Sequence, residues 1–384
     1  MREIAAVTVA RSDLGIYLPL MKAIDGHQSL RLRVVASGTH LSPAHGATVC
    51  DIERAGFEVF ERVESLVASD TPEGVAKSIG LGVIGFAQLF SRYKPDMLVL
   101  LGDRFDMLPA GLAALPYRIP VAHLHGGEVT EGVIDEAIRH SLSKISHLHF
   151  VSTEEHAARL RQLGEEDWRI TISGALALDA IGRMNLMTKE ELRQTFDLDF
   201  SSPTLLVTYH PVTLEVEDTE RHITALLEAL SKLGLPCLFT SPNSDTGSQI
   251  IIEKVESYCR THPQSHAIKN AGQRGYWSVM NAAAAMVGNS SSGIIESPSF
   301  GLPVVNIGSR QRGRMQTRNV INCGYHTDEI VDAIRRAIDG EFHAGLQGLT
   351  NPYGDGQAAG RITTVLASIG LDQRLIQKRF IDHR

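Results

Sequence analysis

The strongest constraint on the fold is a regular alternation between short apolar runs and longer helical patterns. In the first half of the chain the apolar runs span residues 4–9, 33–37, 97–101, 120–123 and 148–152. Uninterrupted apolar strands that alternate with helices are typical of βαβ units, because helices cover both faces of a parallel sheet. The alternation pauses near residue 174 and restarts at residue 204. We therefore predict an α/β protein with two doubly wound parallel sheets.

The pause in the pattern sets the expected domain boundaries. We assign residues 1–175 to an N-terminal Rossmann-like domain and residues 204–365 to a second one. Residues 176–203 are expected to link them, and residues 366–384 to form a closing helix that can pack back on the first domain. Folds of this class bind ligands at the carboxyl ends of their strands, so we expect the active site in the cleft between the two halves.

Composition limits the class of partner. Of 384 residues, 43% are hydrophobic and 21% charged, as in soluble globular proteins, and the net charge of −7 argues against binding nucleic acid. The four scattered cysteines form no CxxC motif and are typical of reduced cytosolic thiols. We see no signal peptide and no apolar run near the ~18–20 residues of a membrane helix. The sequence predicts a cytoplasmic protein with no membrane partner.

A candidate phosphate-binding segment follows the apolar run at residues 282–287. The chain continues with a serine-rich turn and then a helical pattern over residues 293–300, and small residues before a helix suit an anion. A serine-rich cap followed by a basic loop is the structural alternative. On the functional hypothesis, the binding residues are Ser290, Ser291, Gly293, Glu296 for the ribose, and Arg310 as a phosphate cation.

Other polar residues also stand where predicted strands end. They are Arg11, Asp13, Asp103, Asp106, His125, Glu128 and His210. Each alone has a structural explanation, since an aspartate in this position can cap the following helix. Together they would place acids, an imidazole and an arginine on one side of the two sheets.

A helix predicted over residues 135–145 carries a further acid. Asp135 and Glu136 precede Arg139 and His140, and carboxylates are favoured in a first turn by the helix dipole. The functional hypothesis makes Asp135 a general base that Arg139 anchors. His210 precedes a proline that fixes the backbone, which favours a defined position for its imidazole.

Three motif matches lack their required context. The glycines at 80, 82 and 85 match a dinucleotide fingerprint but lie inside a helical pattern. The pairs His123/His125 and His147/His149 have no matching acid set for a metal. The serine-rich turn lacks the second glycine of a nucleophile elbow. We therefore expect no nicotinamide cofactor and no metal.

At this point the chain resembles the hydrolysing UDP-N-acetylglucosamine 2-epimerases of sialic-acid and related nonulosonic-acid biosynthesis. The resemblance covers nearly the whole chain and implies a GT-B fold. It rests on Arg11-x-Asp13, Gly102-Asp103-Arg104-Phe105-Asp106, Gly126-Gly127-Glu128, Ile134-Asp135-Glu136-Ala137-Ile138-Arg139-His140, His210-Pro211-Val212-Thr213, Pro242-Asn243-Ser244-Asp245, Gly288-Asn289-Ser290-Ser291 and Arg310-Gln311-x-Gly313-Arg314.

The resemblance implies a reaction and the roles of individual residues. Loss of the C2 proton and departure of UDP from C1 would give a glycal-type intermediate, to which water and a new C2 proton add. Asp103 and Asp135 become the acid/base candidates, and His210 assists the leaving phosphate. The implied substrate contacts are Arg11, Asp13, Glu128, Arg139, Asn243, Ser290, Ser291, Gly293, Glu296 and Arg310. The family also implies a homodimer or homotetramer.

Two departures leave the substrate open. Many relatives have glutamate where this chain has His125, and some have lysine in the loop that here reads Leu14-Gly15-Ile16. A histidine can also move protons near neutral pH, so we include His125 among the catalytic candidates. The sugar is N-acetylglucosamine or a 2,4-diacetamido-trideoxy analogue, carried on UDP or GDP. The rival functions are a non-hydrolysing 2-epimerase, a GT-B glycosyltransferase and a non-catalytic sensor of sugar nucleotides.

Overall fold

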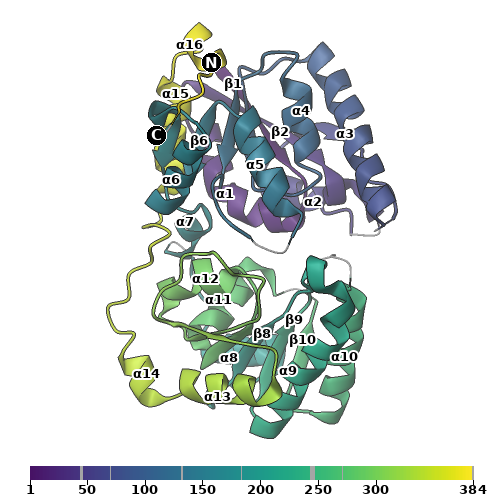
Figure 1. Cartoon of the computed structure of the whole chain (residues 1–384), viewed down its shortest axis with the longest axis vertical. Coiled ribbons are helices and arrows are strands. Elements are labelled where there is room, and N and C mark those ends of the chain that lie inside the picture. The colour runs from purple at the N-terminus through teal and green to yellow at the C-terminus, as the bar shows by residue number, and fades with distance from the viewer. Residues whose placement is uncertain are drawn as a thin grey trace. The chain divides into compact units, whose positions relative to one another are not determined.

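The computed structural model describes residues 1–43, 46–69, 71–130, 133–182, 184–242, 247–269 and 271–382. The chain divides into two compact units (Figure 1). Unit 1 comprises Met1–Glu128, Asp135–Gly182 and Tyr353–Arg384, and unit 2 comprises Val129–Ile134 and Arg183–Pro352.

Unit 1 is built on a seven-stranded parallel sheet in the order β3-β2-β1-β4-β5-β6-β7. Its strands are β1 (Arg2–Thr8), β2 (Leu30–Ser37), β3 (Val59–Val63), β4 (Met97–Leu101), β5 (Val121–Leu124), β6 (Leu148–Val151) and β7 (Ile170–Ile172). The strand order reverses between β1 and β4. In sheets of this class, ligands bind at the carboxyl ends of the strands where the order reverses.

Helices cover both faces of this sheet (Figure 1). They are α1 (Arg11–Asp25), η1 (Gly38–Leu41), α2 (Val49–Arg54), α3 (Pro72–Arg92), α4 (Leu108–Ala114), α5 (Asp135–Ile145), α6 (Glu154–Gln162), η3 (Asp167–Arg169), α7 (Ala177–Ile181), α15 (Ala358–Ser368) and α16 (Gln373–Ile376). The central strands β4 and β5 are buried along their full length. This burial explains why their sequences are apolar at every position rather than at alternate ones.

Helix α3 corrects one expectation from the sequence. Among the described residues it is the one helix that is long and apolar enough to cross a membrane, judged by length and composition alone. In this structure it packs against α4 and β3, and buries Phe86, Leu89 and Phe90 in the core of unit 1. Gly82 permits this packing, because an added Cβ would lie 2.7 Å from the ring of Pro109.

Unit 2 has a six-stranded parallel sheet in the order β10-β9-β8-β11-β12-β13, which reverses between β8 and β11. Its strands are β8 (Leu205–Thr208), β9 (Cys237–Thr240), β10 (His266–Ile268), β11 (Ala285–Gly288), β12 (Val304–Ile307) and β13 (Val320–Cys323). Its helices are α8 (Lys189–Phe196), η4 (Thr213–Asp218), α9 (Thr219–Leu233), α10 (Ser248–Thr261), α11 (Gly272–Ala282), α12 (Ser292–Ile295), η5 (Ser297–Phe300), α13 (Thr327–Ala337) and α14 (Gly340–Ala344). The prediction of two doubly wound parallel sheets is confirmed.

Two local expectations were wrong. Strands β3, β7 and β13 were not predicted from the sequence. All three lie at sheet edges, where one side of the strand has no strand partner and a solvated face tolerates polar residues. The single helix expected over residues 293–300 is instead α12 followed by η5. Pro298 lies at the start of η5 and has no N–H to continue an α-helical ladder.

The compact units differ from the predicted domains. Unit 2 ends at Pro352, so the expected boundary at residue 365 falls inside α15, which packs on α1 in unit 1. Residues 176–203 are divided between the units, with α7 in unit 1 and α8 in unit 2. The C-terminal segment is attached to unit 1 by the buried Arg169, which donates hydrogen bonds to the carbonyl oxygens of Arg374, Leu375 and Gln377.

Candidate functional site

In unit 1 the candidate residues gather where adjacent strands end. Asp103 follows β4, and its Oδ2 accepts a hydrogen bond from Nη2 of Arg139 on α5. Arg139 is buried, and its Nη1 also contacts the Glu128 carbonyl oxygen at 3.0 Å and Glu136 Oε2 at 2.5 Å. Burial alone would lower the pKa of Arg139, but Asp103, Glu128 and Glu136 raise it. The guanidinium therefore stays charged and joins three acidic residues.

A second cluster follows β5. His125 Nδ1 lies 2.8 Å from Glu128 Oε1, and Ser152 Oγ at the end of β6 lies 3.3 Å from the same imidazole nitrogen. His125 has a left-handed backbone, with φ 64°. The tight turn also requires Gly127, because an added Cβ there would lie 2.4 Å from the His156 carbonyl oxygen. The imidazole and carboxylate form a pair, with Nε2 on the opposite side of the ring from Glu128.

The loops after β1 and β4 bring further carboxylates together. Asp13, in the first turn of α1, and Asp106 are both buried. Burial raises the pKa of Asp13 to about 7, and nearby Arg104 opposes this while Asp106 and Asp103 add to it. Arg104 Nε lies 3.3 Å from Asp106 Oδ1. This is a carboxyl group that exchanges its proton near neutral pH.

Two predicted residues of unit 1 are more exposed. Arg11 is half exposed and faces Asp51, with 3.5 Å between Nε and Oδ2. Asp135 begins α5 and is half-buried, one turn before Arg139 on the same helix face. The structure thus brings Asp103, Glu128, Arg139 and Asp135 onto neighbouring elements, as expected from the sequence.

In unit 2 His210 is held by an amide clamp. The His210 N–H donates to Asn289 Oδ1 at 2.7 Å, and Asn289 Nδ2 donates to the His210 carbonyl oxygen at 2.8 Å. Burial, and then the charge of Arg310, lowers the pKa of His210 well below its usual value. Its imidazole is therefore neutral at pH 7. Gly288 allows this approach of β8 and β11, because an added Cβ would lie 1.9 Å from the Thr208 carbonyl oxygen.

The serine-rich turn differs in detail from the predicted phosphate-binding helix. Helix α12 has four residues, and the Gly293 N–H is already bonded to the Ser290 carbonyl oxygen at 3.2 Å. Within the described ranges, the N–H groups of Ser290 and Ser291 donate to no protein acceptor. Ser290 Oγ and Ser292 Oγ lie 3.0 Å apart. The available donors are therefore the N–H groups of Ser290 and Ser291 in the turn, rather than those at the start of α12.

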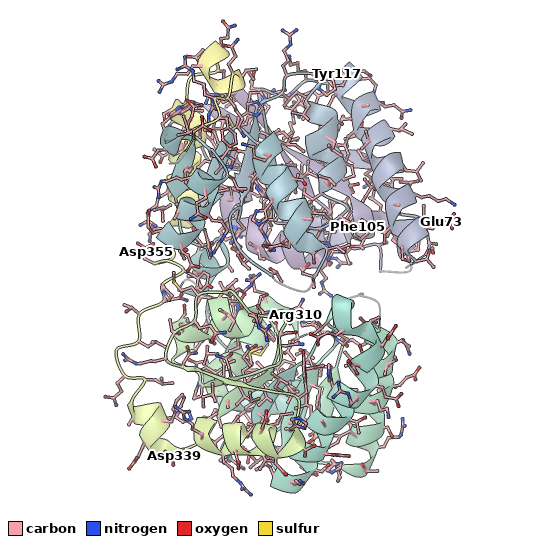
Figure 2. All side chains as sticks on the ribbon, in the orientation of Figure 1. Glu73, Phe105, Tyr117, Arg310, Asp339 and Asp355 are labelled. Atoms are coloured by element: carbon pink, nitrogen blue, oxygen red, sulfur yellow. The ribbon has the colours of Figure 1, made fainter. Side chains whose placement is uncertain are left out.

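Neighbouring side chains of unit 2 surround the serine-rich turn. Trp277 Nε1 donates to Glu296 Oε2 at 2.9 Å, and burial raises the pKa of Glu296 to about 7. Tyr276 OH lies 2.6 Å from Ser292 Oγ. Arg310 Nη1 and Gln311 Nε2 both donate to the Asn289 carbonyl oxygen, at 3.0 and 2.8 Å. Figure 2 labels Arg310 among the side chains of unit 2. Arg310 therefore lies beside the serine turn, as predicted.

Some functional candidates could not be found from the sequence, and one cannot be placed. Asn243 lies outside the described residues. Tyr276 and Trp277 on α11 lie in an ordinary helical pattern, so no local signal marked them. Asn289 and Gln311 were visible in the motifs, but their hydrogen-bonding role depends on a partner far along the chain.

Within the described ranges no group of three or more histidine, cysteine or acidic residues is arranged to hold a metal.

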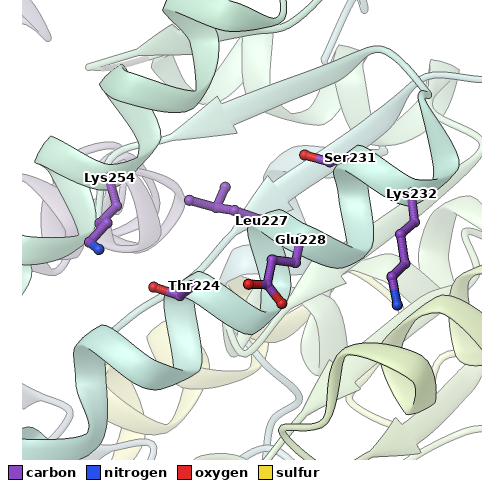
Figure 3. A pocket seen from close by; sticks show the side chains of 6 residues that line it. All are labelled: Thr224, Leu227, Glu228, Ser231, Lys232 and Lys254. Atoms are coloured by element: carbon purple, nitrogen blue, oxygen red, sulfur yellow. The ribbon is translucent and has the colours of Figure 1, made fainter.

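A surface pocket of about 360 Å³ lies elsewhere in unit 2 (Figure 3). It is formed by α9 and α10 and is lined by Thr224, Leu227, Glu228, Ser231, Lys232 and Lys254. None of these residues belongs to the clusters at the strand ends. We therefore do not assign the chemistry to this pocket.

The buried carboxyl of Asp13 predicts a pH-dependent stability. Its pKa is raised from 3.8 to about 7, so the folded state binds the proton more tightly, and stability is lost as pH rises through this window. Replacing Asp13→Asn should remove this loss. Between pH 5 and 8 the variant should gain on the order of 2–3 kcal/mol relative to the wild type.

Urea unfolding at a series of pH values measures this difference. Asp25→Asn, at the exposed end of the same helix, is the matched control and should show no such trend. A constant difference between Asp13→Asn and the wild type across this range would contradict the assignment.

Comparisons with known proteins agree with the geometry. A family model described as UDP-N-acetylglucosamine 2-epimerase matches residues 22–367. The GDP/UDP-N,N'-diacetylbacillosamine 2-epimerase (hydrolyzing) of Campylobacter jejuni is 39% identical, over 99% of each chain. The UDP-N,N'-diacetylbacillosamine 2-epimerase (hydrolyzing) of Legionella pneumophila is 35% identical, over 98% of this chain and 99% of the relative.

Solved structures support the fold. The UDP-GlcNAc 2-epimerase of Neisseria meningitidis, bound to UDP-GlcNAc, superposes with a TM-score of 0.82 at 18% identity, over 95% of this chain and 99% of that one. A UDP-N-acetylglucosamine 2-epimerase structure from Listeria monocytogenes gives the same TM-score of 0.82 at 17% identity, over 96% of each chain. The resemblance seen in the sequence is confirmed, and the chain belongs to the UDP-N-acetylglucosamine 2-epimerase family.

Proposed function

We propose that this enzyme is a hydrolysing 2-epimerase of a nucleotide-linked 2-acetamido sugar. Nucleotide sugar and water would give the free 2-epimeric sugar and the nucleoside diphosphate. The observation that carries the proposal is the convergence of Asp103, Asp13 and Glu128 with Arg139 at the ends of neighbouring strands. Its full-length relatives named as hydrolyzing 2-epimerases support the same reaction.

The first step removes the C2 proton and expels the nucleotide from C1. Inversion at C2 requires proton removal on one face of the sugar and delivery on the other, and so two acid/base groups. Asp103 and Asp135 are assigned to these roles. Arg139 supports the assignment, because it contacts the Asp103 carboxylate and lies one turn from Asp135 on α5. It holds the first carboxylate in a fixed position.

We assign the addition of water at C1 to the pair formed by His125 and Glu128. Nδ1 of His125 faces the Glu128 carboxylate at 2.8 Å, so a proton on Nε2 can be given or taken while the carboxylate stabilises the imidazolium. Relatives with glutamate at this position would use a carboxylate directly. The paired histidine can fill the same acid/base role.

The groups of unit 2 are assigned to the nucleotide. The Ser290 hydroxyl, the N–H groups of Ser290 and Ser291, and the Arg310 guanidinium would bind the diphosphate, and Glu296 the ribose hydroxyls. His210 is neutral because of burial and Arg310, so it would assist the leaving phosphate as an N–H donor rather than as a cation. Arg310 supplies the positive charge that stabilises the departing diphosphate.

For the sugar we propose a UDP-linked 2,4-diacetamido-trideoxyhexose, as used in legionaminic-acid pathways. The support is twofold. His125 departs from the glutamate of many N-acetylglucosamine enzymes, and relatives at 39% and 35% identity are named for N,N'-diacetylbacillosamine. UDP-N-acetylglucosamine is the second candidate, and GDP is the alternative carrier.

We further propose that the enzyme is a cytoplasmic homo-oligomer that associates through α3 and α4. The four cysteines are all unpaired, as a reducing compartment would keep them. Helices α3 and α4 pack against each other and expose large apolar side chains. These are Leu81 and Ile84 on α3, Leu112 on α4, and Leu115 directly after α4. Adjacent exposed apolar residues favour association with another protein surface.

Incubation in D₂O, followed by proton and phosphorus NMR, tests the reaction. We expect free UDP and a 2-epimeric sugar with deuterium at C2, formed faster from the diacetamido substrate than from UDP-N-acetylglucosamine. Deuterium at C2 with UDP still attached would indicate the non-hydrolysing epimerase. Transfer to an acceptor without exchange would indicate a glycosyltransferase, and binding without turnover a sensor. Parallel GDP-linked substrates decide the nucleotide.

Asp135→Asn should lower kcat by about 100- to 10,000-fold, because an amide cannot take or give the C2 proton. UDP affinity should stay within a few fold. Asp328→Asn is the matched control, since Asp328 lies in the first turn of α13 and is exposed. Near-normal turnover by Asp135→Asn would remove Asp135 from the mechanism.

Ser290→Ala should weaken UDP binding by about tenfold, the loss expected for one hydrogen bond to a charged group. Isothermal titration with UDP measures this change. Ser231→Ala, in the pocket of Figure 3, should bind UDP normally. Equal affinity for wild type and Ser290→Ala would exclude the serine hydroxyl from the diphosphate site.

Ile84→Glu should convert the assembly to smaller species, because a charge in the apolar contact loses its hydration on association. Sedimentation velocity measures the shift. Ile172→Glu makes the same change at an exposed position on β7 and should leave the assembly intact. An unchanged assembly in Ile84→Glu, or a monomeric wild type, would contradict the proposed surface.

A further inference from the structure

The side chain of His123 lies beneath the catalytic elements of unit 1 and is not used in the reaction described above. It is fully buried on β5, between the turn after β4 and helix α5. We propose that His123 is a positioning residue that locks the turn carrying Asp103 to the helix carrying Asp135. This inference rests on the proposed function for its effect on turnover.

The turn at Gly102 is attached to β5 on both sides. Gly102 has a left-handed backbone, with φ 76°, and its N–H donates to the Leu124 carbonyl oxygen at 3.0 Å. Its carbonyl oxygen faces His123 Nε2 at 2.7 Å. Both backbone polar groups of Gly102, the residue before Asp103, are therefore fixed, and so is the direction in which the aspartate leaves the strand.

The partners of His123 define its tautomer. A carbonyl oxygen only accepts, so the proton must be on Nε2. Burial lowers the pKa of His123 to about 4, so the ring is neutral at the working pH and Nδ1 is an acceptor. The partner of Nδ1 is Ser143 Oγ at 3.2 Å, whose hydroxyl donates the hydrogen bond. A protonated imidazole could still donate from Nε2, but its Nδ1 could not accept the hydrogen bond from Ser143.

Ser143 connects this imidazole to the second catalytic carboxylate. Asp135, Arg139 and Ser143 are spaced four residues apart on α5 and lie on one face of it. Arg139 binds the Asp103 side chain, while His123 connects Ser143 to the backbone before Asp103. The turn and the helix are thereby joined at two points, which defines their separation and their rotation.

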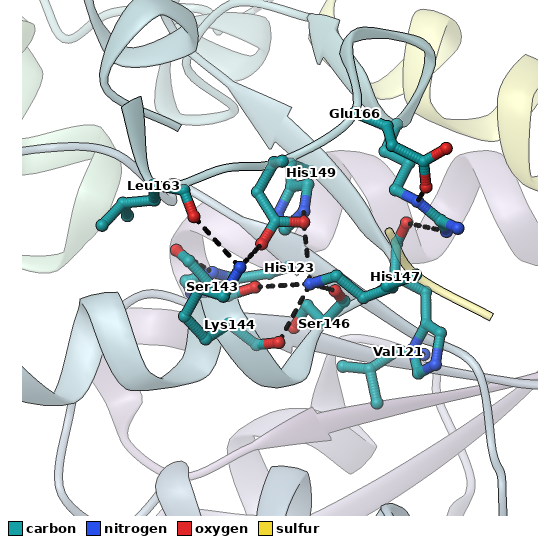
Figure 4. A network of polar contacts seen from close by, with 12 residues as sticks. Val121, His123, Ser143, Lys144, Ser146, His147, His149, Leu163 and Glu166 are labelled. Atoms are coloured by element: carbon teal, nitrogen blue, oxygen red, sulfur yellow. Dashed lines mark hydrogen bonds and ion pairs between the residues drawn. The ribbon is translucent and has the colours of Figure 1, made fainter. Parts of the chain in front are cut away.

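The surrounding structure leaves little freedom for this connection. A Cβ on Gly126 would lie 2.9 Å from both His123 Nδ1 and Ser143 Oγ, so the glycine lets the two groups meet. Figure 4 shows His123 and Ser143 beside the end of α5. There Lys378 Nζ donates to the carbonyl oxygens of Ser146 at 2.6 Å and Lys144 at 2.9 Å. The C-terminal segment thus secures the end of the helix that Ser143 belongs to.

The consequence for catalysis follows from geometry. If Gly102 loses its donor, the turn that carries Asp103 loses one of its attachments, and the carboxylate can move away from its position. A misplacement of about 1 Å can cost on the order of 100-fold in rate. The loss should appear in kcat, while nucleotide binding by the groups of unit 2 should be retained.

Three substitutions test the proposal. His123→Leu removes both contacts, and His123→Gln places an amide N–H where Nε2 stood. Ser143→Ala removes only the donor to Nδ1. We expect His123→Leu to lower kcat on the order of 100-fold, His123→Gln to retain kcat within about fivefold, and Ser143→Ala to give an intermediate loss. KM and the Kd for UDP should change less than about threefold in all three.

Controls separate positioning from general core damage. His222→Leu removes a buried histidine from unit 2 and should not reproduce the kcat effect. Melting temperatures identify variants that fail to fold. If His123→Leu does not fold, the kcat values of His123→Gln and Ser143→Ala test the proposal. Equal kcat losses in His123→Leu and His123→Gln, or a normal kcat in His123→Leu, would overturn the proposal.

Amide hydrogen exchange provides a readout that does not depend on activity. The Gly102 N–H should exchange faster in His123→Leu than in wild type, and His123→Gln should restore its protection. If the wild type turns over no nucleotide sugar, the proposed function fails while this measurement still decides the positioning role. Unchanged exchange at Gly102 in His123→Leu would refute that role.

Discussion

A single buried guanidinium holds together the acidic edge of unit 1. Arg139 reaches Asp103 after β4, the backbone of Glu128 after β5, and Glu136 on its own helix. Removing one partner from a buried ion pair typically costs about 3–5 kcal/mol, because the remaining charge is left without compensation. The arrangement therefore constrains three segments at once. The positive charge of Arg139 allows several acidic residues to lie close together, although their negative charges would otherwise repel one another.

The candidate site in unit 2 is built from mostly neutral groups. Asn289 clamps His210 with paired amide bonds, and Arg310 and Gln311 both donate to the Asn289 carbonyl oxygen. On the proposed function unit 2 binds a nucleoside diphosphate, whose negative charge neutral donors and one cation can stabilise, whereas extra carboxylates would repel it. Glu296 is compatible with a neighbouring anion. Burial raises its pKa to about 7, so the carboxyl group carries less negative charge near neutral pH.

The proton chemistry and the anion chemistry are thus carried by different kinds of residue. Burial raises the pKa of Asp13 in unit 1 to about 7, and His125 is paired with Glu128 at the end of β5. Perturbed carboxyl groups of this kind are enriched in active sites, since a useful acid or base titrates near the working pH. Burial and the charge of Arg310 lower the pKa of His210 well below its usual value, so its imidazole stays neutral near pH 7.

The sequence by itself determined the fold class and the strand ends that carry Asp103, His125, His210 and Ser290. Apolar runs between helices report burial on both faces of a parallel sheet, and that pattern is local. Edge strands such as β13 were not predicted from this pattern, because an edge strand pairs with one neighbour only and is less buried. What the tertiary structure decided is which distant groups meet. Tyr276 reaches Ser292, Arg169 fixes the C-terminal segment, and His123 joins Gly102 to Ser143. These contacts depend on strand order and register, and no short stretch of sequence contains both partners.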